Sequence, residues 1–280
     1  MNEPSPDASE SAPARHGRSG RAENLRFLIT LALVAFVLRS FIVAPFSIPS
    51  ESMLPRLLVG DYLFVAKWPY GYSRHSLPWS IPLIPHRIFA RAPDRGDIVV
   101  FKNPADNSTD YIKRVIGLPG DLVQVKGGQL ILNGTPVPKV RIADFVDPVS
   151  PNSPCRPVPG GRIKLETLPD GGLVCRYARY RETLPGGRAY AVLDIGETAA
   201  DDTAVFVVPE GHFFLMGDNR DRSADSRFPA EIGGGIGMVP EENLVGRALV
   251  GFFSTDGSAE WLMPWTWFTA ARWERIGEGF

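Results

Sequence analysis

The sequence predicts a mostly β protein that is preceded by one apolar helix. Two observations lead to this fold class. A long apolar run, residues 25–46, stands near the start of the 280-residue chain, and short strand-like segments separated by glycine and proline make up most of the remainder. The 28 glycines and 26 prolines suit a turn-rich antiparallel sheet. We therefore expect an N-terminal transmembrane helix, then an antiparallel, partly closed, β-barrel-like domain.

The N-terminal part divides into a polar tail, residues 1–24, and the apolar run 25–46. The tail is rich in Ser, Pro, Ala and Arg without periodicity, so we expect it to be disordered. The apolar run is long enough for a membrane span, which needs roughly 20 residues. A cleaved secretory signal with residues 27–38 as its apolar core is the alternative. Because Arg39 interrupts the run and Ile42 is large for a cleavage site, an uncleaved anchor is favoured.

Positive charge before the apolar run predicts its orientation. Arg15, Arg18, Arg21 and Arg26 all precede it or stand at its edge. Since basic residues stay on the cytoplasmic side, the N-terminus should be cytoplasmic and residues 47–280 should lie outside.

Strand-like segments with alternating or continuous apolar residues follow the anchor. We expect strands at 61–67, 96–102, 111–117, 121–126, 129–132, 203–208, 212–216 and 244–253. Asn133-Gly134 and Gly127-Gly128 are hairpin signals. Residues 47–134 and 201–256 should form the main β domain, and 135–200, rich in proline, a smaller inserted β subdomain.

The two cysteines, Cys155 and Cys175, both lie in this insertion. They lack C-x-x-C spacing and the four histidines are scattered, so we expect no metal site. A disulfide that closes an irregular loop is preferred, and two unrelated buried thiols are the alternative. The net charge of −1 argues against nucleic acid as a partner.

Two segments are unusually aromatic for solvent-exposed chain: 68–90 and the C-terminal tail 257–280, in which 261–273 carries four of the six tryptophans. Tryptophan and tyrosine favour the membrane interface. Prolines prevent 68–90 from forming a regular buried element, so we expect it at the membrane. For the tail, membrane contact and a packed terminal helix both remain open.

A serine and a lysine are the candidate reactive groups. Ser52 lies between Pro49 and Pro55, which restrict its backbone, and Lys113 stands in an apolar strand-like segment. A serine needs a base, and a desolvated lysine whose pKa falls from about 10.4 to about 7–8 can serve as one. The alternative is a strand-edge lysine whose amine reaches water.

Four ordered motifs make this pairing specific. They are Ser50-x-Ser52-Met53-x-Pro55 with Gly60-Asp61, then Arg-Gly-Asp-Ile-Val-Val-Phe at 95–101, Tyr-Ile-Lys-Arg-Val-Ile-Gly-Leu-Pro-Gly-Asp at 111–121, and Gly-Asp-Asn-Arg-Asp-Arg-Ser-Ala-Asp-Ser-Arg at 217–227. Together they resemble the conserved boxes of bacterial type I signal peptidases (leader peptidases), a family of Ser-Lys dyad serine proteases. The resemblance covers most of the chain.

The resemblance implies a role for each matching residue. Ser52 aligns with the nucleophile and Lys113 with the general base. Ser50 aligns with a serine whose hydroxyl forms an oxyanion hole together with the Ser52 backbone N–H. Two further assignments concern the last box: Ser223 aligns with a serine that hydrogen-bonds and orients the lysine amine, and Asp225 and Arg227 align with a supporting ion pair.

The resemblance also implies the function: a membrane-anchored serine endopeptidase that removes N-terminal signal peptides from exported preproteins without a cofactor. Its place would be the bacterial cytoplasmic (inner) membrane, single-pass, with the catalytic domain on the periplasmic side. Preproteins, the lipid bilayer and proximity to the secretion translocon follow as partners. A narrow-client protease, pilin-type or self-processing, and a non-catalytic membrane-tethered binding domain are the alternatives.

Three departures from the family pattern concern regions outside the dyad. The family's best-studied members often have two transmembrane spans, whereas this sequence has one candidate. Residues 228–239 are longer than the usual link from the last box, and the cysteines are widely spaced.

Overall fold

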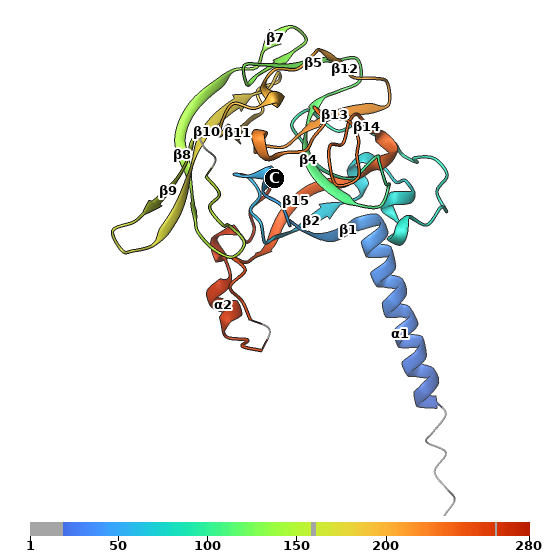
Figure 1. The fold of residues 1–280 in the computed structure, drawn as a ribbon. Helices are drawn as coiled ribbons and strands as arrows, with labels where there is room; N and C mark the ends of the chain where they lie inside the picture. The colour runs from blue at the N-terminus through green and yellow to red at the C-terminus, as the bar shows by residue number, and fades with distance from the viewer. Residues whose placement is uncertain (1–18, 158–160, 261) are drawn as a thin grey trace, which may run out of the picture.

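The computed structural model describes residues 19–157, 161–260 and 262–280. An apolar helix, α1 (Ser19–Val37), projects from a body made almost entirely of β-strands (Figure 1). The main sheet is antiparallel and curls into an open half-barrel, so the predicted fold class is confirmed.

Helix α1 continues through one π-helical turn, Leu38–Ile42, and residues Ala22–Ile42 are long and apolar enough to cross a membrane. The helix begins at Ser19, six residues before the predicted apolar run; residues 1–18 of the predicted tail lie outside the described residues. The predicted end at residue 46 is too late. Strand β1 (Val43–Ser47) already begins at Val43, before the predicted end of the helix. Pro45 cannot continue a helix, but it is accommodated here because β1 is an edge strand.

The main sheet positions both candidate reactive residues: Lys113 lies on strand β4, and Ser52 lies in the connection between β1 and β2. Its described strands run in the spatial order β1-β2-β15-β3-β4-β13-β14, and every pairing is antiparallel. Their bounds are β2 (Asp61–Ala66), β3 (Ile98–Lys102), β4 (Asp110–Gly117), β13 (His212–Met216), β14 (Val239–Pro240) and β15 (Leu244–Ser254). Strand β4 is therefore an interior strand, flanked by β3 and β13.

Two smaller sheets complete the body. One has the order β11-β10-β8, with β9 also paired to β10, and the other has the order β12-β5-β6-β7. Their bounds are β8 (Lys139–Pro148), β9 (Ile163–Thr167), β10 (Leu173–Thr183), β11 (Ala189–Leu193), β5 (Leu122–Lys126), β6 (Gln129–Leu132), β7 (Thr135–Pro136) and β12 (Phe206–Val207). The inserted segment thus contains two long strands, β8 and β10, in a range for which no individual strand was predicted.

The smaller sheets share their cores with the main sheet. Phe214 of β13 packs with Leu130 of β6 and Val192 of β11 in one buried cluster. In another, Leu54 and Tyr177 pack together, so the segment that follows Ser52 lies against the inserted sheet. The division of the chain into the predicted domains stays a prediction, but each smaller sheet shares a buried cluster with the main sheet or its connecting segments.

Short helical turns connect the strands. The described ones are Glu51–Met53, Trp68–Tyr70, Arg74–Ser76, Pro78–Ser80, Ala199–Asp201, Arg220–Arg222, Glu241–Asn243 and Trp273–Arg275, and α2 (Thr266–Ala270) lies in the C-terminal tail. The first and the sixth of these turns meet at the candidate site.

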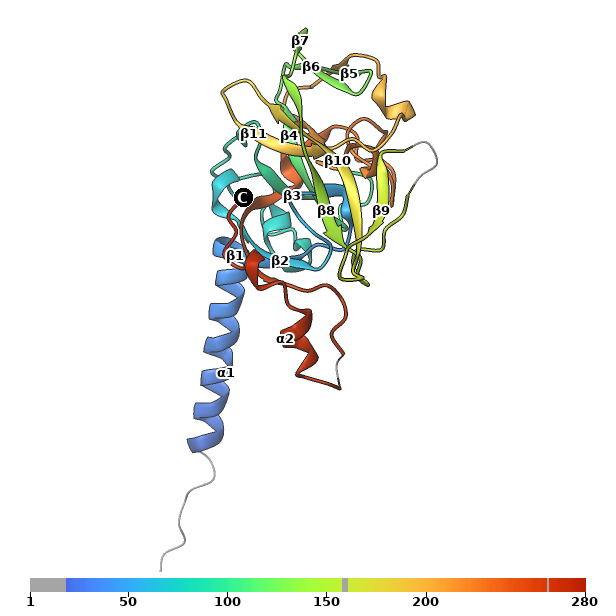
Figure 2. The same cartoon turned by 90° about the vertical axis from the view of Figure 1, so that its left-hand side faces the viewer.

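The two aromatic segments leave large apolar side chains in solvent. Trp79 in the loop is 91% exposed and Leu262 in the tail is 93% exposed. The loop docks on the end of the anchor, where the Tyr72 hydroxyl donates to the Phe41 carbonyl at 3.0 Å. Helix α2 and its flanking tail extend from the body on the same side as α1 (Figures 1 and 2). The tail is therefore not packed as a buried terminal helix.

Candidate active site

Ser52 lies on a tight turn between β1 and β2. The turn, Glu51–Met53, is buried at Ser52 and Met53, and Asn219 holds its backbone. The Asn219 N–H donates to the Ser52 carbonyl and its side-chain amide donates to the Glu51 carbonyl, both at 3.0 Å. A serine on this turn is fixed in position before any substrate arrives.

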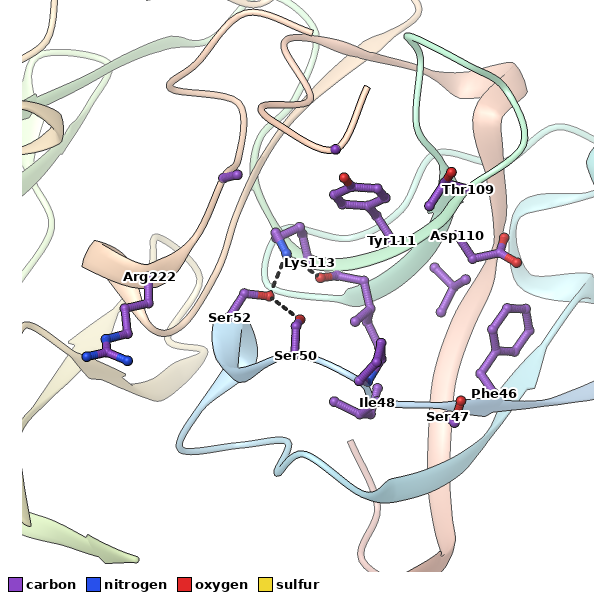
Figure 3. Close-up of a pocket in the computed structure, with 15 residues that line it drawn as sticks. Phe46, Ser47, Ile48, Ser50, Ser52, Thr109, Asp110, Tyr111, Lys113 and Arg222 are labelled. Carbon is purple, nitrogen blue, oxygen red and sulfur yellow. Dashed lines mark hydrogen bonds between the residues drawn. The ribbon is translucent and has the colours of Figure 1, made fainter. Parts of the chain in front are cut away.

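Lys113 reaches this serine from the interior of the main sheet. Its Nζ donates to Ser52 Oγ at 2.7 Å and to the Ile112 carbonyl at 3.1 Å (Figure 3). The two side chains come from positions 61 residues apart, and only 3% of the Lys113 surface is exposed. The sequence-based alternative of a strand-edge lysine with its amine in water does not describe this side chain.

Burial lowers the pKa of Lys113 to about 8 because the charged amine is poorly solvated. The carboxylates of Asp225 and Asp218 act in the opposite direction and raise the pKa. At neutral to mildly alkaline pH an appreciable share of the amine is therefore unprotonated. A neutral amine at hydrogen-bond distance from a serine hydroxyl can accept its proton.

A cavity of about 340 Å³ opens in front of the pair. Ser52 and Lys113 stand between its two ends: Phe46 and Asp110 lie at one end and Arg222 at the other (Figure 3). The main-sheet side is lined by apolar and aromatic groups from Ile48, Val100, Tyr111 and Ile112. An extended peptide can lie along this groove with one carbonyl at the serine.

Ser50 lines the same cavity, with its Oγ 3.4 Å from Ser52 Oγ (Figure 3). Its hydroxyl and the nucleophile candidate therefore face the same space. This placement suits a hydroxyl that donates to a developing oxyanion, and that role stays a prediction here.

Ser223 is close to the serine turn, but its hydroxyl is buried without a hydrogen-bond partner among the residues that the structure describes. The expected bond from Ser223 to the lysine amine is thus not formed in this structure. Gly217 explains the close packing here. A Cβ at Gly217 would lie 2.3 Å from Ser223 Oγ and 2.5 Å from the Ser52 carbonyl oxygen.

Asp225 and Arg227 form a fully buried ion pair. Arg227 Nε donates to Asp225 Oδ1 at 2.8 Å, and Nη2 donates to Oδ2 at 2.9 Å. Asp225 also accepts from the Gly217 N–H at 3.1 Å. The pair therefore shapes the turn that carries Ser223 and places a carboxylate close enough to act on the pKa of Lys113.

Two further buried ion pairs around the site were not expected from the sequence. Arg114 makes a bidentate pair with Asp218 at 2.7 and 2.6 Å, and Arg220 Nη1 donates to Glu182 at 2.8 Å. The partners are 104 and 38 residues apart, so no local pattern joins them. One feature of the sequence could have indicated such a pair: Arg114 is a second cation in an apolar strand, and a buried charge needs a partner.

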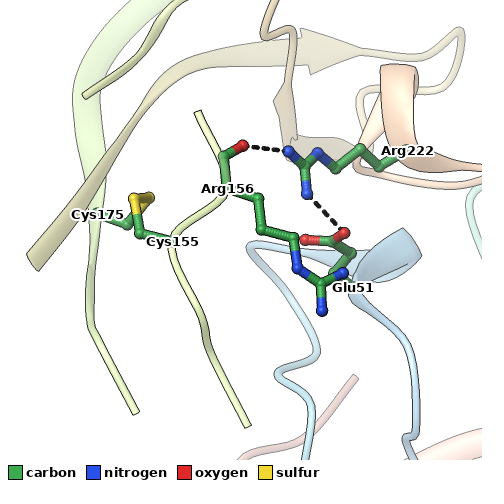
Figure 4. The surroundings of a disulfide bond; sticks show 5 residues. All are labelled: Glu51, Cys155, Arg156, Cys175 and Arg222. Carbon is green, nitrogen blue, oxygen red and sulfur yellow. Dashed lines mark hydrogen bonds and ion pairs between the residues drawn. A yellow bond between two sulfur atoms is a disulfide. The ribbon is translucent and has the colours of Figure 1, made fainter. Parts of the chain in front are cut away.

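The structure joins Cys155 and Cys175 by a disulfide with an S–S distance of 1.97 Å (Figure 4). Cys175 lies buried on β10, and Cys155 lies in the loop between β8 and β9. Within the described residues, no group of three or more His, Cys, Asp or Glu side chains is arranged to hold a metal ion.

Comparison with known proteins gives consistent matches. The family model "Signal peptidase, peptidase S26" matches residues 21–253. Signal peptidase I of Rickettsia typhi is 38% identical over 231 residues, covering 79% of this chain and 76% of the relative, and that of Rickettsia conorii is 37% identical over the same shares. A solved signal peptidase I from Enterococcus faecalis covers 56% of this chain and 97% of its own, at 23% identity and a TM-score of 0.29, too low to bear on the fold.

We expect Gly217→Ala to displace the serine turn, because the added methyl group overlaps both Ser223 and the Ser52 carbonyl. The free energy of unfolding should fall by about 1–3 kcal/mol, measured by denaturant unfolding of the purified chain in detergent. Gly196→Ala is the control, since among the described residues its Cβ would meet only Gly161, at 3.8 Å. Equal unfolding midpoints for the two variants would contradict the close packing at Gly217.

Proposed function

The chain belongs to the signal peptidase family, peptidase S26, and is a serine peptidase; we propose that it cleaves the signal peptides of exported preproteins with Ser52 as nucleophile and Lys113 as general base. The observation that carries this assignment is the 2.7 Å contact between Lys113 Nζ and Ser52 Oγ at the floor of a peptide-sized groove. The family supports the reaction class, and the geometry supports these two residues.

The proposed reaction has two halves. In the first, the neutral Lys113 amine takes the Ser52 hydroxyl proton as Oγ attacks the scissile carbonyl carbon, and the resulting tetrahedral oxyanion collapses by breaking the C–N bond. Lys113 returns the proton to the departing amine, which leaves an ester on Ser52. In the second, the amine takes a proton from water, hydroxide attacks the ester carbonyl, and Ser52 is released with its proton restored.

The negative oxygen of each tetrahedral intermediate needs donors that are already in place. We assign this role to the Ser50 hydroxyl and the Ser52 N–H. Ser50 lies beside Ser52 on the cavity wall, and donors that meet charge only when it develops lower the barrier without holding the substrate more tightly.

Substrate binding is assigned to the apolar end of the groove. The family implies small residues one and three positions before the cut, and the walls formed by Ile48, Tyr111 and Ile112 would exclude large side chains from the space beside Ser52. The signal-peptide segment would lie along these residues, and the mature chain would leave past Arg222.

The bilayer is the proposed partner of α1 and of both aromatic segments. Basic residues before α1 and in its first turns support a cytoplasmic N-terminus, with the body outside, at the surface from which preproteins would emerge. Trp79 and Trp265, both exposed, would lie at the head groups beside the anchor. Confinement to the membrane raises the effective concentration of an enzyme whose substrate is also held there. Proximity to the translocon stays a prediction.

We expect Ser52→Ala and Lys113→Met each to lower kcat by at least about a thousandfold, because the two groups act as a unit. The assay is mass spectrometry of a purified preprotein incubated with the full chain in detergent. One cut after a small-x-small sequence should appear with the wild type. Several unrelated preproteins should be cut alike; cleavage of one client alone would point to a narrow-client protease.

Lys67→Met is the matched control for this experiment. Burial lowers the pKa of Lys67 to about 8, as it does for Lys113, but Lys67 does not line the groove; its Nζ lies 5.9 Å from the centre of the Phe46 ring at the groove's end and makes no contact with Ser52. Its loss leaves Ser52 and Lys113 in contact, so kcat should fall far less than in Lys113→Met. Equal losses for the two lysine variants would mean that burial alone, and not contact with Ser52, explains the effect.

The pH dependence of kcat/KM should report Lys113. Only the neutral amine is a base, so kcat/KM should rise as pH increases through an apparent pKa near 8. Asp225→Asn removes a carboxylate that raises the pKa of Lys113, so the rising limb should move to lower pH. An unchanged limb in a folded Asp225→Asn variant would show that another group controls the profile.

Orientation and membrane contact can be read by thiol labelling of the full chain in intact spheroplasts. A membrane-impermeant maleimide should modify Ser258→Cys, an exposed position outside the membrane. It should modify Phe268→Cys, exposed on α2, only after detergent is added, because lipid covers this side chain. If neither position is labelled before lysis, the proposed topology is wrong. If both are labelled rapidly in intact spheroplasts, the tail does not lie in the bilayer.

A further inference from the structure

Arg222 occupies the end of the groove beyond Ser52 and contacts two separate parts of the chain (Figures 3 and 4). Its Nη1 donates to Glu51 Oε1 at 2.7 Å, and its Nη2 donates to the backbone carbonyl of Arg156. Neither contact belongs to the reaction described above. The guanidinium therefore bridges the serine turn and the loop of the inserted sheet.

The disulfide determines where the Arg156 carbonyl lies. Cys155 is the residue immediately before it, and the bond to Cys175 fastens this point of the loop to β10 (Figure 4). On the other side, Asn152 anchors the loop by donating from its backbone to Asp256 and from its side chain to Thr255, both at 2.9 Å. Without the disulfide, the chain after Cys155 would lose its covalent attachment to the sheet.

Glu51 links the disulfide loop to Ser52. It is the residue before Ser52 and the first of the buried turn. Its backbone carbonyl is held by Asn219 and its carboxylate by Arg222, so the turn is fixed from two directions. A displacement of Ser52 by even a fraction of an ångström changes its approach to Lys113, and misplacement of about 1 Å can cost about a hundredfold in rate.

We propose that Arg222 is a positioning residue that couples the Cys155–Cys175 disulfide to Ser52 through Glu51, so that the oxidised enzyme turns over faster than the reduced one. This inference rests on the proposed function of Ser52. The Arg222–Glu51 pair is partly exposed, with 15% and 28% of the side-chain surfaces accessible. Such pairs contribute little to stability, so loss of the bridge should affect turnover more than folding.

The test is a set of full-chain variants assayed on one preprotein: Arg222→Gln, Glu51→Gln, the double variant Cys155→Ser/Cys175→Ser, and Arg222→Gln combined with that double variant. We expect kcat to fall about tenfold in each, with KM changed less than about twofold. The kcat of the variant that combines Arg222→Gln with Cys155→Ser/Cys175→Ser should be no lower than that of the slower of these two variants. Both changes break the same series of contacts, so their effects should not add. Arg222→Lys, which can keep one of the two contacts, should be intermediate.

Arg176→Gln is the matched control, since it breaks another arginine–carboxylate pair of the inserted sheet, with Glu166, away from the groove. It should leave kcat unchanged. Wild-type kcat in the folded cysteine variant, or additive losses in the combination, would overturn the coupling.

If the cysteine variant does not fold, reduction of the folded wild type replaces it. Thiol labelling confirms that the disulfide is open, and kcat should fall as in Arg222→Gln; an unchanged kcat would overturn the coupling. Wild-type enzyme and Ser52→Ala run in parallel separate the two hypotheses. A wild type that fails to cleave contradicts the proposed function, whereas normal wild-type cleavage with fully active Arg222 and cysteine variants contradicts only the coupling.

Discussion

The removal of the Lys113 amine from water is the constraint on which the site depends. Burial in the middle of the main sheet lowers the pKa to about 8, and two carboxylates, Asp225 and Asp218, keep it from falling further. Each carboxylate is itself paired with a buried arginine, Arg227 or Arg114. Each of these buried carboxylates is therefore neutralised by a partner, which makes its burial tolerable.

The same turn that supplies these carboxylates also holds Ser52, the proposed nucleophile. Asn219 fastens the backbone of the Ser52 turn, Gly217 allows the two segments to touch, and Arg222 clamps Glu51. A reactive serine must be held within a fraction of an ångström of its base, and several independent supports achieve this better than one. The inserted sheet takes part in this support, because Leu54 packs on it and the disulfide loop contacts Arg222.

The exposed aromatic segments make the surface of the molecule asymmetric. The anchor α1 and the tail that carries α2 extend from the same side of the body (Figure 2), and the loop that contains Trp79 contacts the end of the anchor through Tyr72. Exposed tryptophans are costly in water and favourable at a lipid head-group layer.

The sequence by itself determined the features that depend on neighbouring residues. Hydropathy located the apolar helix, alternation located most strands, and the motifs around Ser52 and Lys113 singled out the pair that the fold brings to 2.7 Å. The local sequence pattern did not predict the strand boundaries that depend on pairing with distant strands. Strand β1 starts inside the predicted anchor because it pairs with β2, and β8 and β10 are long because they pair with each other.

Only the tertiary structure decided the supports of the site. The Arg222–Glu51 bridge joins positions 171 residues apart, and the Arg114–Asp218 pair spans 104. The hydroxyl of Ser223 was expected on the lysine amine and has no partner within the described residues. Spacing along the chain carries no information about such contacts, because they depend on how separate sheets pack and on which charges that packing removes from water.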